Sequence, residues 1–415
     1  MKKILFSLLG IMLFVSAADA KRYIITVENN TRAPINWDAF ISRAGGGEVV
    51  DTFDFIDGAL LDLPEEQAER LMSRRAPGMT IEEDIVINWI QDSGVSAKQA
   101  FSKYGGNEAN NISVPVASAA APVSTNKSDL TSTVPMQGEF PWGITRVNAS
   151  GLWNITEGAG VKVAVIDTGI NYKHEDLKDN YVDGANYSGL IKGILGINWG
   201  DPMDDQGHGT HVAGTIAAVR NGKGVVGVAP KAKLYAVKVM TKDGRGSLSA
   251  IIKGLEWAVK NKMNIANMSL GGGPYMESMH KAVKNAVANG VTIIAAAGND
   301  GGPVNYPAKY PETIAVSASA PNDTIAPFSS RGEEIEVMAP GMWIMSTSFE
   351  GGYVEHHGTS MACPHVAGLA ALAYAAGYKT PAEIRTALKK AAVPVKNLTA
   401  AEQGAGIPDA SKLKK

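Results

Sequence analysis

The sequence predicts an α/β fold, a parallel sheet with helices on both faces, preceded by a small α+β unit. Beyond Trp142, continuous apolar runs such as VKVAVID and VTIIAAAG alternate with amphipathic patterns such as SLSAIIKGLEWAVKNK. Strands that are buried on both faces have unbroken apolar sequences, and the helices between parallel strands provide that cover. Ahead of this region the elements are shorter and their order is different.

Residues 21–92 are predicted to form the small unit. Strand patterns (RYIITVEN, VVDTFDFIDGALLDL, MTIEEDIVINWI) and helical patterns (INWDAFISRAGG, PEEQAERLMSRR) follow one another in the order β-α-β-β-α-β, which is typical of a ferredoxin-like fold. Between Glu48 and Asp92 there are twelve acidic residues and three arginines. This excess indicates either a solvated acidic face or a module with its own partner.

Two further segments flank this unit. Residues 1–20 combine two lysines, an apolar run from Ile4 to Val15 and the small-residue site ADA, so they are predicted to be a secretory signal peptide cut after Ala20. The run is too short for a membrane anchor, which needs about 20 apolar residues. Residues 93–135 lose all periodicity and are rich in Ala, Ser, Thr and Pro, which predicts an exposed linker. Residues 136–415 form the main domain.

Composition excludes several classes of protein. The chain is 45% hydrophobic and 19% charged with a net charge of −2, which argues against disorder and against a strong field for nucleic acid. We expect a monomer that binds no nucleic acid and, after removal of the signal peptide, no membrane. Cys363 is the single cysteine, so no intramolecular disulfide can form. Stability outside the cell must come from packing or from a bound ion.

The tripeptide DTG at 167–169 ends an apolar run and allows three interpretations. A ribose-binding acid would require a G-x-G-x-x-G turn about 20 residues upstream, and the sequence ASGLWNITEGAG before this strand contains none. An aspartic protease would need a second such loop, and the match DSG at 92–94 lies at the edge of the linker. The third interpretation is the orienting acid of a serine nucleophile.

That third interpretation predicts a histidine and a serine elsewhere in the main domain. His208 lies in GHGTHVAGTIAA and Ser360 in GTSMACPHVAGLAA, each where a glycine-containing loop becomes a helix. A serine hydroxyl needs a base held in one tautomer by a buried acceptor, and a helix N-terminus favours a developing oxyanion. Asn299 ends the strand VTIIAAAG and could donate to the same oxyanion.

Five motifs together resemble the subtilisin-like serine peptidases, the subtilase family: DTG, GHGTHVAG, SLGG, AAAGN and GTSMACPHVAG. Their order along the chain is the one known for that family. The resemblance extends from about Trp142 to the C-terminus, and residues 21–92 resemble the family's inhibitory pro-domain. It implies that Asp167 orients His208, that His208 is general base and then acid, that Ser360 attacks the scissile carbonyl, and that Asn299 stabilises the oxyanion together with the Ser360 N–H.

The resemblance also implies substrate contacts. Two segments would flank an extended peptide, and a first pocket would lie between the second segment and the end of the strand before Asn299. Asp300 and Asn305 would lie near its rim and floor; Asn305 replaces a usual glycine, and an apolar or mixed P1 preference is expected. The implied substrate residues are Gly244, Arg245 and Gly246 on one side, Ser269, Leu270 and Gly271 on the other, Ala296, Ala297 and Gly298 in the first pocket, and Leu248 and Ile251 in an apolar pocket further along.

Calcium is the cofactor that the resemblance implies. Asp176 and Asn221 would bind it through side chains and Val219, Lys223 and Val225 through carbonyls, all oxygen donors of the kind that this cation prefers. The family's N-terminal ligand matches poorly, because Gln137 is displaced by one position.

These features together predict a secreted endopeptidase, extracellular or periplasmic, made as a zymogen that processes itself within the linker. Its partners would be protein or peptide substrates and its own pro-domain. A catalytically silent binding protein on the same fold, and an esterase or transpeptidase, are the alternatives. The remaining side chains receive structural interpretations: a buried small hydrophobe for Cys363, packing for His211 and His365, and surface or loop positions for His174, His280, His356 and His357.

Overall fold

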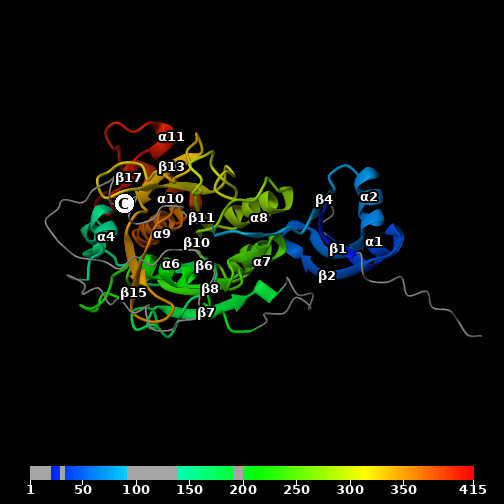
Figure 1. Cartoon of the computed structure of the whole chain (residues 1–415), viewed down its shortest axis with the longest axis horizontal. Helices are drawn as coiled ribbons and strands as arrows, with labels where there is room; N and C mark the ends of the chain where they lie inside the picture. Colours follow the sequence, from blue (N-terminus) through cyan, green and yellow to red (C-terminus); the bar gives the residue numbers. More distant parts are fainter. Residues whose placement is uncertain (1–19, 29–32, 91–138, 190–199) are drawn as a thin grey trace, which may run out of the picture.

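A seven-stranded parallel sheet organises the larger part of the molecule (Figure 1). The computed structural model describes residues 20–28, 33–90, 139–189 and 200–415. Residues 1–19 of the predicted signal peptide, the predicted linker and Gln137 lie outside these ranges. Every pairing in the sheet is parallel, as the sequence predicts. Its order is β13 (Ile335–Pro340), β12 (Ile314–Ser319), β11 (Thr292–Ala296), β10 (Ile265–Met268), β6 (Lys162–Asp167), β8 (Lys233–Lys238) and β7 (Tyr181–Asn186).

Helices cover both faces of this sheet. Alternate residues of β6 show the division: Val163 and Val165 pack in one apolar cluster, whereas Ala164 and Ile166 pack in another. Side chains alternate between the faces of a strand, so each cluster is one layer of the core. The first layer includes α6 (His208–Ala217), α9 (Thr359–Ala375) and α10 (Pro381–Ala391), and the second includes α7 (Leu248–Lys260) and α8 (Glu277–Ala288).

The N-terminal unit is a four-stranded antiparallel sheet with two helices (blue in Figure 1). The sheet order is β2-β3-β1-β4, and the element order is the predicted β-α-β-β-α-β. One sheet face packs on the unit's own helices through Ile25, and the other places Ile24, Phe53 and Ile56 against α7 and α8. Its elements are β1 (Ala20–Thr26), α1 (Trp37–Ala44), β2 (Glu48–Phe53), η2 (Asp54–Ile56), β3 (Gly58–Pro64), α2 (Glu65–Ser73) and β4 (Thr80–Glu83).

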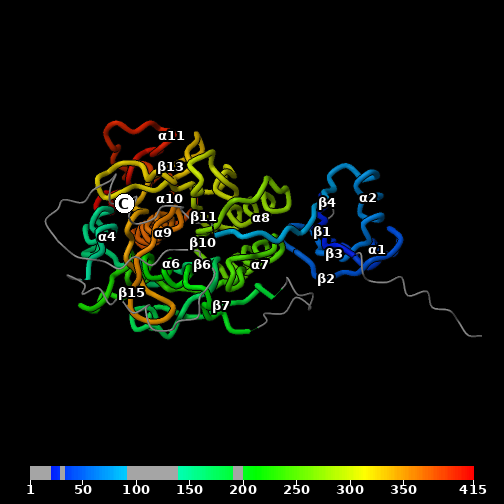
Figure 2. Tube along the Cα trace, in the orientation of Figure 1, coloured from blue at the N-terminus to red at the C-terminus, as the bar shows by residue number. Residues whose placement is uncertain are grey.

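After β4 the chain runs from the N-terminal unit into the main domain, as the light-blue tube in Figure 2 shows. There β5 (Val86–Asn88) pairs antiparallel with β9 (Arg245–Ser247), at the edge of the second helical layer. The smaller elements are α4 (Trp142–Arg146), α5 (Ser150–Trp153), β14 (Ile344–Thr347), β15 (Tyr353–His356), β16 (Ala392–Val393), α11 (Ala400–Gln403), β17 (Ile407–Pro408) and η4 (Ala410–Lys412). Within the described ranges, no helix is long and apolar enough to cross a membrane.

Candidate active site

A buried carboxylate and an imidazole meet at the carboxyl end of β6. Asp167 is fully buried, and its Oδ1 lies 2.8 Å from Nδ1 of His208, the first residue of α6. The same oxygen accepts the N–H of Thr168 at 2.7 Å. A carboxylate acceptor fixes the tautomer of a neutral imidazole, with the proton on Nδ1 and the lone pair on Nε2. The sheet topology thus provides a base whose orientation is set by its neighbour.

The loop before α6 fixes where His208 begins its helix. Asp204 accepts the N–H of Gly207 at 2.9 Å and both the N–H and the hydroxyl of Thr210, at 2.9 and 2.6 Å. A side-chain carboxylate that binds the free N–H groups of the first turn stabilises a helix start. Gly207 has φ of 113°, a left-handed conformation that other residues adopt only at a cost. The first turn, and with it the imidazole, is therefore held in place by its own loop.

The environment of His208 changes its pKa. Burial lowers the pKa of this imidazole, but the charge of Asp167 and the hydrogen bond to it, with a further contribution from Asp204, outweigh burial and raise the pKa above its ordinary value. Nε2 has no hydrogen-bond partner among the residues that the structure describes. This nitrogen is the atom that could take a proton from a nucleophile.

Ser360 is the second residue of α9, which packs against α6. Pro364 lies within α9 and has no N–H, so the Ser360 carbonyl lacks its usual donor inside the helix. The Ser269 hydroxyl donates to that carbonyl at 2.8 Å, and the Ser360 hydroxyl donates to the Ser269 carbonyl at 3.2 Å. Ser360 is thus bonded to Ser269 in both directions, and its hydroxyl donates to Ser269 rather than to His208.

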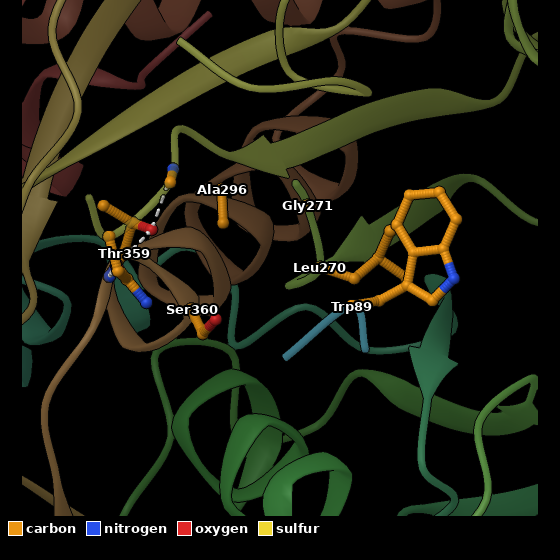
Figure 3. Close-up of a pocket in the computed structure, with 8 residues that line it drawn as sticks. Trp89, Leu270, Gly271, Ala296, Thr359 and Ser360 are labelled. Carbon is orange, nitrogen blue, oxygen red and sulfur yellow. Dashed lines mark hydrogen bonds between the residues drawn. The ribbon is translucent and has the colours of Figure 1, made fainter. Parts of the chain in front are cut away.

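Asn299 is oriented by the residue that precedes the serine. The Thr359 N–H and hydroxyl both donate to Oδ1 of Asn299 at 2.8 Å. The Thr359 hydroxyl also accepts the Gly298 N–H at 3.1 Å, and Figure 3 shows Thr359 with these bonds beside Ser360. Because the amide oxygen is held in this way, the amide nitrogen must be the atom that is presented as a donor.

Comparison with known proteins decides the family. Residues 158–406, more than half of the chain, match the model of the subtilase family. This chain belongs to the subtilase family. It is 48% identical to subtilisin BL of Lederbergia lenta over 236 residues, and this matched stretch covers 56% of this chain and 83% of that protein. It is 48% identical over 238 residues to subtilisin E of Bacillus subtilis (strain 168) and 47% over 241 residues to M-protease of Shouchella clausii (strain KSM-K16), in each case across 60% of the relative. Membership makes the chain a serine protease, a hydrolase that acts on peptides or proteins.

In this subtilase the segment after β4 lies between the two predicted substrate-flanking strands. Its strand β5 pairs with β9, where Ile87 lies opposite Gly246 and Asn88 opposite Arg245. Trp89 then donates its N–H to the Gly244 carbonyl at 3.1 Å and accepts the Gly271 N–H at 3.0 Å. The chain's own segment 86–89 therefore binds both edges, in the way that an added peptide strand would.

A small crevice lies between this segment and Ser360. Trp89, Leu270 and Gly271 line one side, and Thr359 and Ser360 lie at the other, with Ala296, Gly298 and Asn299 completing the wall (Figure 3). The predicted pocket residues Ala297, Leu248 and Ile251 are fully buried, and all three share an apolar cluster with Trp89. Asn305 does not line the crevice. Its backbone N–H donates to the Ala297 carbonyl, and its side chain lies beside Gly298, where a Cβ would come within 2.2 Å of Nδ2.

His174 lies in a loop, as expected, but it is buried there. Its ring bonds the Gly352 carbonyl and the Asp176 N–H, which pins the loop after β6 to the β14–β15 hairpin. His211 and His365 are fully buried, in keeping with packing roles, and burial lowers the pKa of both. Cys363 is also fully buried; burial raises the pKa of its thiol, which contacts Asn267.

The residues implied as calcium ligands come together. Asp176 is fully buried and accepts bonds from the Asn221 amide at 2.8 Å, the Tyr353 hydroxyl at 2.8 Å and the Val225 N–H at 3.3 Å. No cationic side chain pairs with this carboxylate in the part of the chain that the structure describes, so its charge suits a hard cation. Three converging His, Cys, Asp or Glu side chains, the signature of other metal sites, do not occur in the same ranges.

Several residues of the site were not identified from sequence. Thr359 positions Asn299, and Asp204 positions the helix start at His208. Glu139 holds the loop at Asn221, whose N–H it accepts at 2.7 Å. For Asp204 a signal existed, because an acidic residue shortly before a helix is a common N-cap. The bonds of Thr359 and Glu139 join segments far apart in sequence, and no local pattern reveals them.

We expect Asp167→Asn to lower the pKa of His208. The substitution removes the charge that raises this pKa and leaves the burial that lowers it. An NMR titration of the ring in full-length chains that also carry Ser360→Ala would measure the change. Asp205→Asn, at a neighbouring acid that pairs with Lys238, is the control and should have a much smaller effect. An unchanged or higher pKa in Asp167→Asn would contradict this account of the site.

Proposed function

We propose that the chain is a secreted serine endopeptidase that works through an acyl-enzyme. The observation that carries this proposal is the Asp167–His208 contact, with Nε2 of His208 directed away from it and Ser360 at the start of the adjoining helix. In the first step Ser360 Oγ bonds to the scissile carbonyl carbon and its proton passes to Nε2. The same proton then goes to the leaving amine as the C–N bond breaks. Water repeats the sequence and frees the acid.

Asn299 and the start of α9 would stabilise the oxyanion. The bonds from Thr359 hold the Asn299 oxygen and so fix the amide nitrogen as the donor. The Ser360 N–H lies in the first turn of a 17-residue helix, whose positive dipole end favours negative charge. These donors are in place before the reaction, so they need no reorganisation when the charge develops.

The N-terminal unit would be an inhibitory pro-domain. Its segment 86–89 occupies the edges that an extended substrate would use. Glu82 accepts the N–H groups of Glu277 and Ser278 at the start of α8, and Asp84 accepts the N–H and hydroxyl of Ser249 in the first turn of α7. Bonds to the free N–H groups of two helix starts would help these helices form. In this zymogen scheme residues 1–20 direct export, and the chain then cuts itself beyond Ile90.

The two alternatives make different predictions from a peptidase. A silent binding protein would bind peptides but form no acyl-enzyme. An esterase or transpeptidase would form one but would favour an ester leaving group or an amine acceptor over amide hydrolysis. Kinetics on matched amide and ester substrates, with and without an added amine, would separate these activities.

A fluorophosphonate probe tests the nucleophile and the processing together. We expect the secreted wild-type chain to be shortened and to gain one probe mass, and Ser360→Ala to be full-length and unlabelled, with residual turnover lower by roughly 10⁶-fold. Intact mass spectrometry before and after labelling measures both. Cys363→Ala should label like wild type, because that thiol is buried. A full-length, unlabelled wild type would favour the silent binding protein.

We further propose that Asn305 restricts the first substrate pocket to small P1 side chains. Its side chain lies against Gly298 and Gly271, and a Cβ at Gly298 would come within 2.2 Å of its Nδ2. Burial raises the pKa of Asp300, but hydrogen bonds from Ser330, Gly302 and Asn305, in that order, outweigh it and lower this pKa, so the carboxylate stays charged and holds the amide. A large P1 side chain would have to displace a bonded group.

Asn305→Gly should therefore raise kcat/KM for substrates with Phe at P1 relative to Ala by about tenfold, a typical effect of pocket size. The ratio on two peptides that differ only at P1 measures it. Asn322→Gly, at an exposed position, is the control and should leave the ratio unchanged. An unchanged ratio in Asn305→Gly would mean that another residue limits the pocket.

Calcium is proposed as a stabiliser held by the side chains of Asp176 and Asn221 and the carbonyls of Val219, Lys223 and Val225. A chelator should lower the free energy of unfolding by about 3 kcal/mol relative to calcium at 100-fold its Kd. Urea unfolding of the Ser360→Ala chain with and without chelator measures this. Asp176→Asn should abolish the difference, whereas Asp179→Asn, at an exposed neighbour, should retain it. Equal stability with and without chelator would exclude a stabilising ion.

A further inference from the structure

Lys253 is a nearly buried cation on the face of α7 that the N-terminal unit covers. It lies in the middle of the helix, and only 11% of its side chain is exposed. A charged side chain is seldom buried without a partner, because its lost hydration must be replaced. The partners of Lys253 therefore show what this surface is built to bind.

Those partners come largely from strand β2 of the N-terminal unit. The Lys253 ammonium lies 3.0 Å from Asp51 Oδ1 and donates to the Thr52 carbonyl at 2.5 Å. It also lies 5.1 Å from the centre of the Phe53 ring. Three consecutive residues of one strand thus surround the charge, and Asp51 is itself only 13% exposed at the side chain.

The main domain offers the cation one acidic neighbour of its own. Glu256, one turn along α7, lies 3.2 Å from Lys253 and is shared with Lys260, whose side chain is 60% exposed. Acids and cations therefore alternate from Asp51 through Lys253 and Glu256 to Lys260, and only the first belongs to the N-terminal unit. When that unit leaves, Lys253 loses its acidic partner on the far side and regains water.

Other polar contacts across the same boundary run to backbone groups or hydroxyls. Glu82 binds backbone N–H groups of α8, Lys281 donates to the Thr26 hydroxyl, and Asn285 donates to the Phe55 carbonyl. None of these three contacts joins two charged side chains. A buried pair of opposite charges, in contrast, rejects a partner with the wrong side chain.

We propose that the Lys253–Asp51 pair makes the α7 surface selective for this chain's own N-terminal unit, so that a unit with a neutral or basic side chain at this position is a poor inhibitor. This inference rests on the proposed inhibitory role of the unit. Lys253→Glu would place three acids together, Asp51→Lys would place two buried cations together, and the exchange of both would restore one pair of opposite charges.

The test uses the full chain, processed during secretion, in four forms: wild type, Asp51→Lys, Lys253→Glu and the double exchange. After purification each is diluted, and the delay before peptidase activity appears is followed at several concentrations. We expect each single reversal to shorten the delay by about 30-fold or more, as is typical when one partner of a buried charge pair is lost, and the double exchange to recover most of it. Asp54→Lys and Lys260→Glu, exposed charges next to the same pair, are the matched controls and should keep the wild-type delay.

The outcomes separate the two proposals. If wild type is fully active as soon as it is processed, the inhibitory role itself is wrong. If the activity of the wild type appears after a delay and the single reversals show the same delay, the pair does not select the partner. The same conclusion holds if the delay of the double exchange is as short as that of the single reversals. Should a reversal yield no processed enzyme, the same forms in a Ser360→Ala background provide a second readout. Hydrogen exchange of the α7 and β2 amides should then rise about 30-fold in each single reversal and fall in the double exchange, and equal exchange in all forms would overturn the inference.

Discussion

The contact between the buried Asp167 carboxylate and the His208 ring, at the end of β6, is the interaction on which the rest of the candidate active site depends. Oδ1 of Asp167 exchanges its water for a neighbouring N–H and the His208 ring, and those groups are in place because β6 lies inside a parallel sheet. Strands of one direction deliver their carboxyl ends to a single edge. The same edge receives the segments at Ser269 and Asn299, so one topological rule gathers groups that are about 130 residues apart.

The helix starts at this edge are equally constrained. Asp204 bonds the first turn of α6, and Ser269 supplies the donor that Pro364 removes from the first turn of α9. Each repair uses a group outside the helix concerned. The positions of His208 and Ser360 thus depend on hydrogen bonds to groups outside their own helices.

Much of this could be predicted from the sequence, for identifiable reasons. Apolar runs such as VKVAVID locate buried parallel strands, and the motifs around His208 and Ser360 mark helix starts, so the sheet follows from local patterns. The pairing of Asp167 with His208 was expected from the resemblance to the family. The position of Trp89 between Gly244 and Gly271 did not follow, because it depends on how two folded units meet. The burial of His174 was missed for a similar reason: it is set by contact with a hairpin about 180 residues later. Local periodicity carries no information about such contacts.

Burial of α9 affects how a peptidase is cut by other copies of itself in the same solution. Fifteen of the seventeen residues of this helix are buried, including Ser360 and Pro364. Peptidases cut chains that can leave their fold locally and enter an extended cleft, and tightly packed central helices open least often. Ser360 therefore lies on one of the segments that self-digestion would reach last. Damage by neighbouring copies would begin at exposed turns, and the fragments that accumulate in an ageing preparation would keep α9 intact.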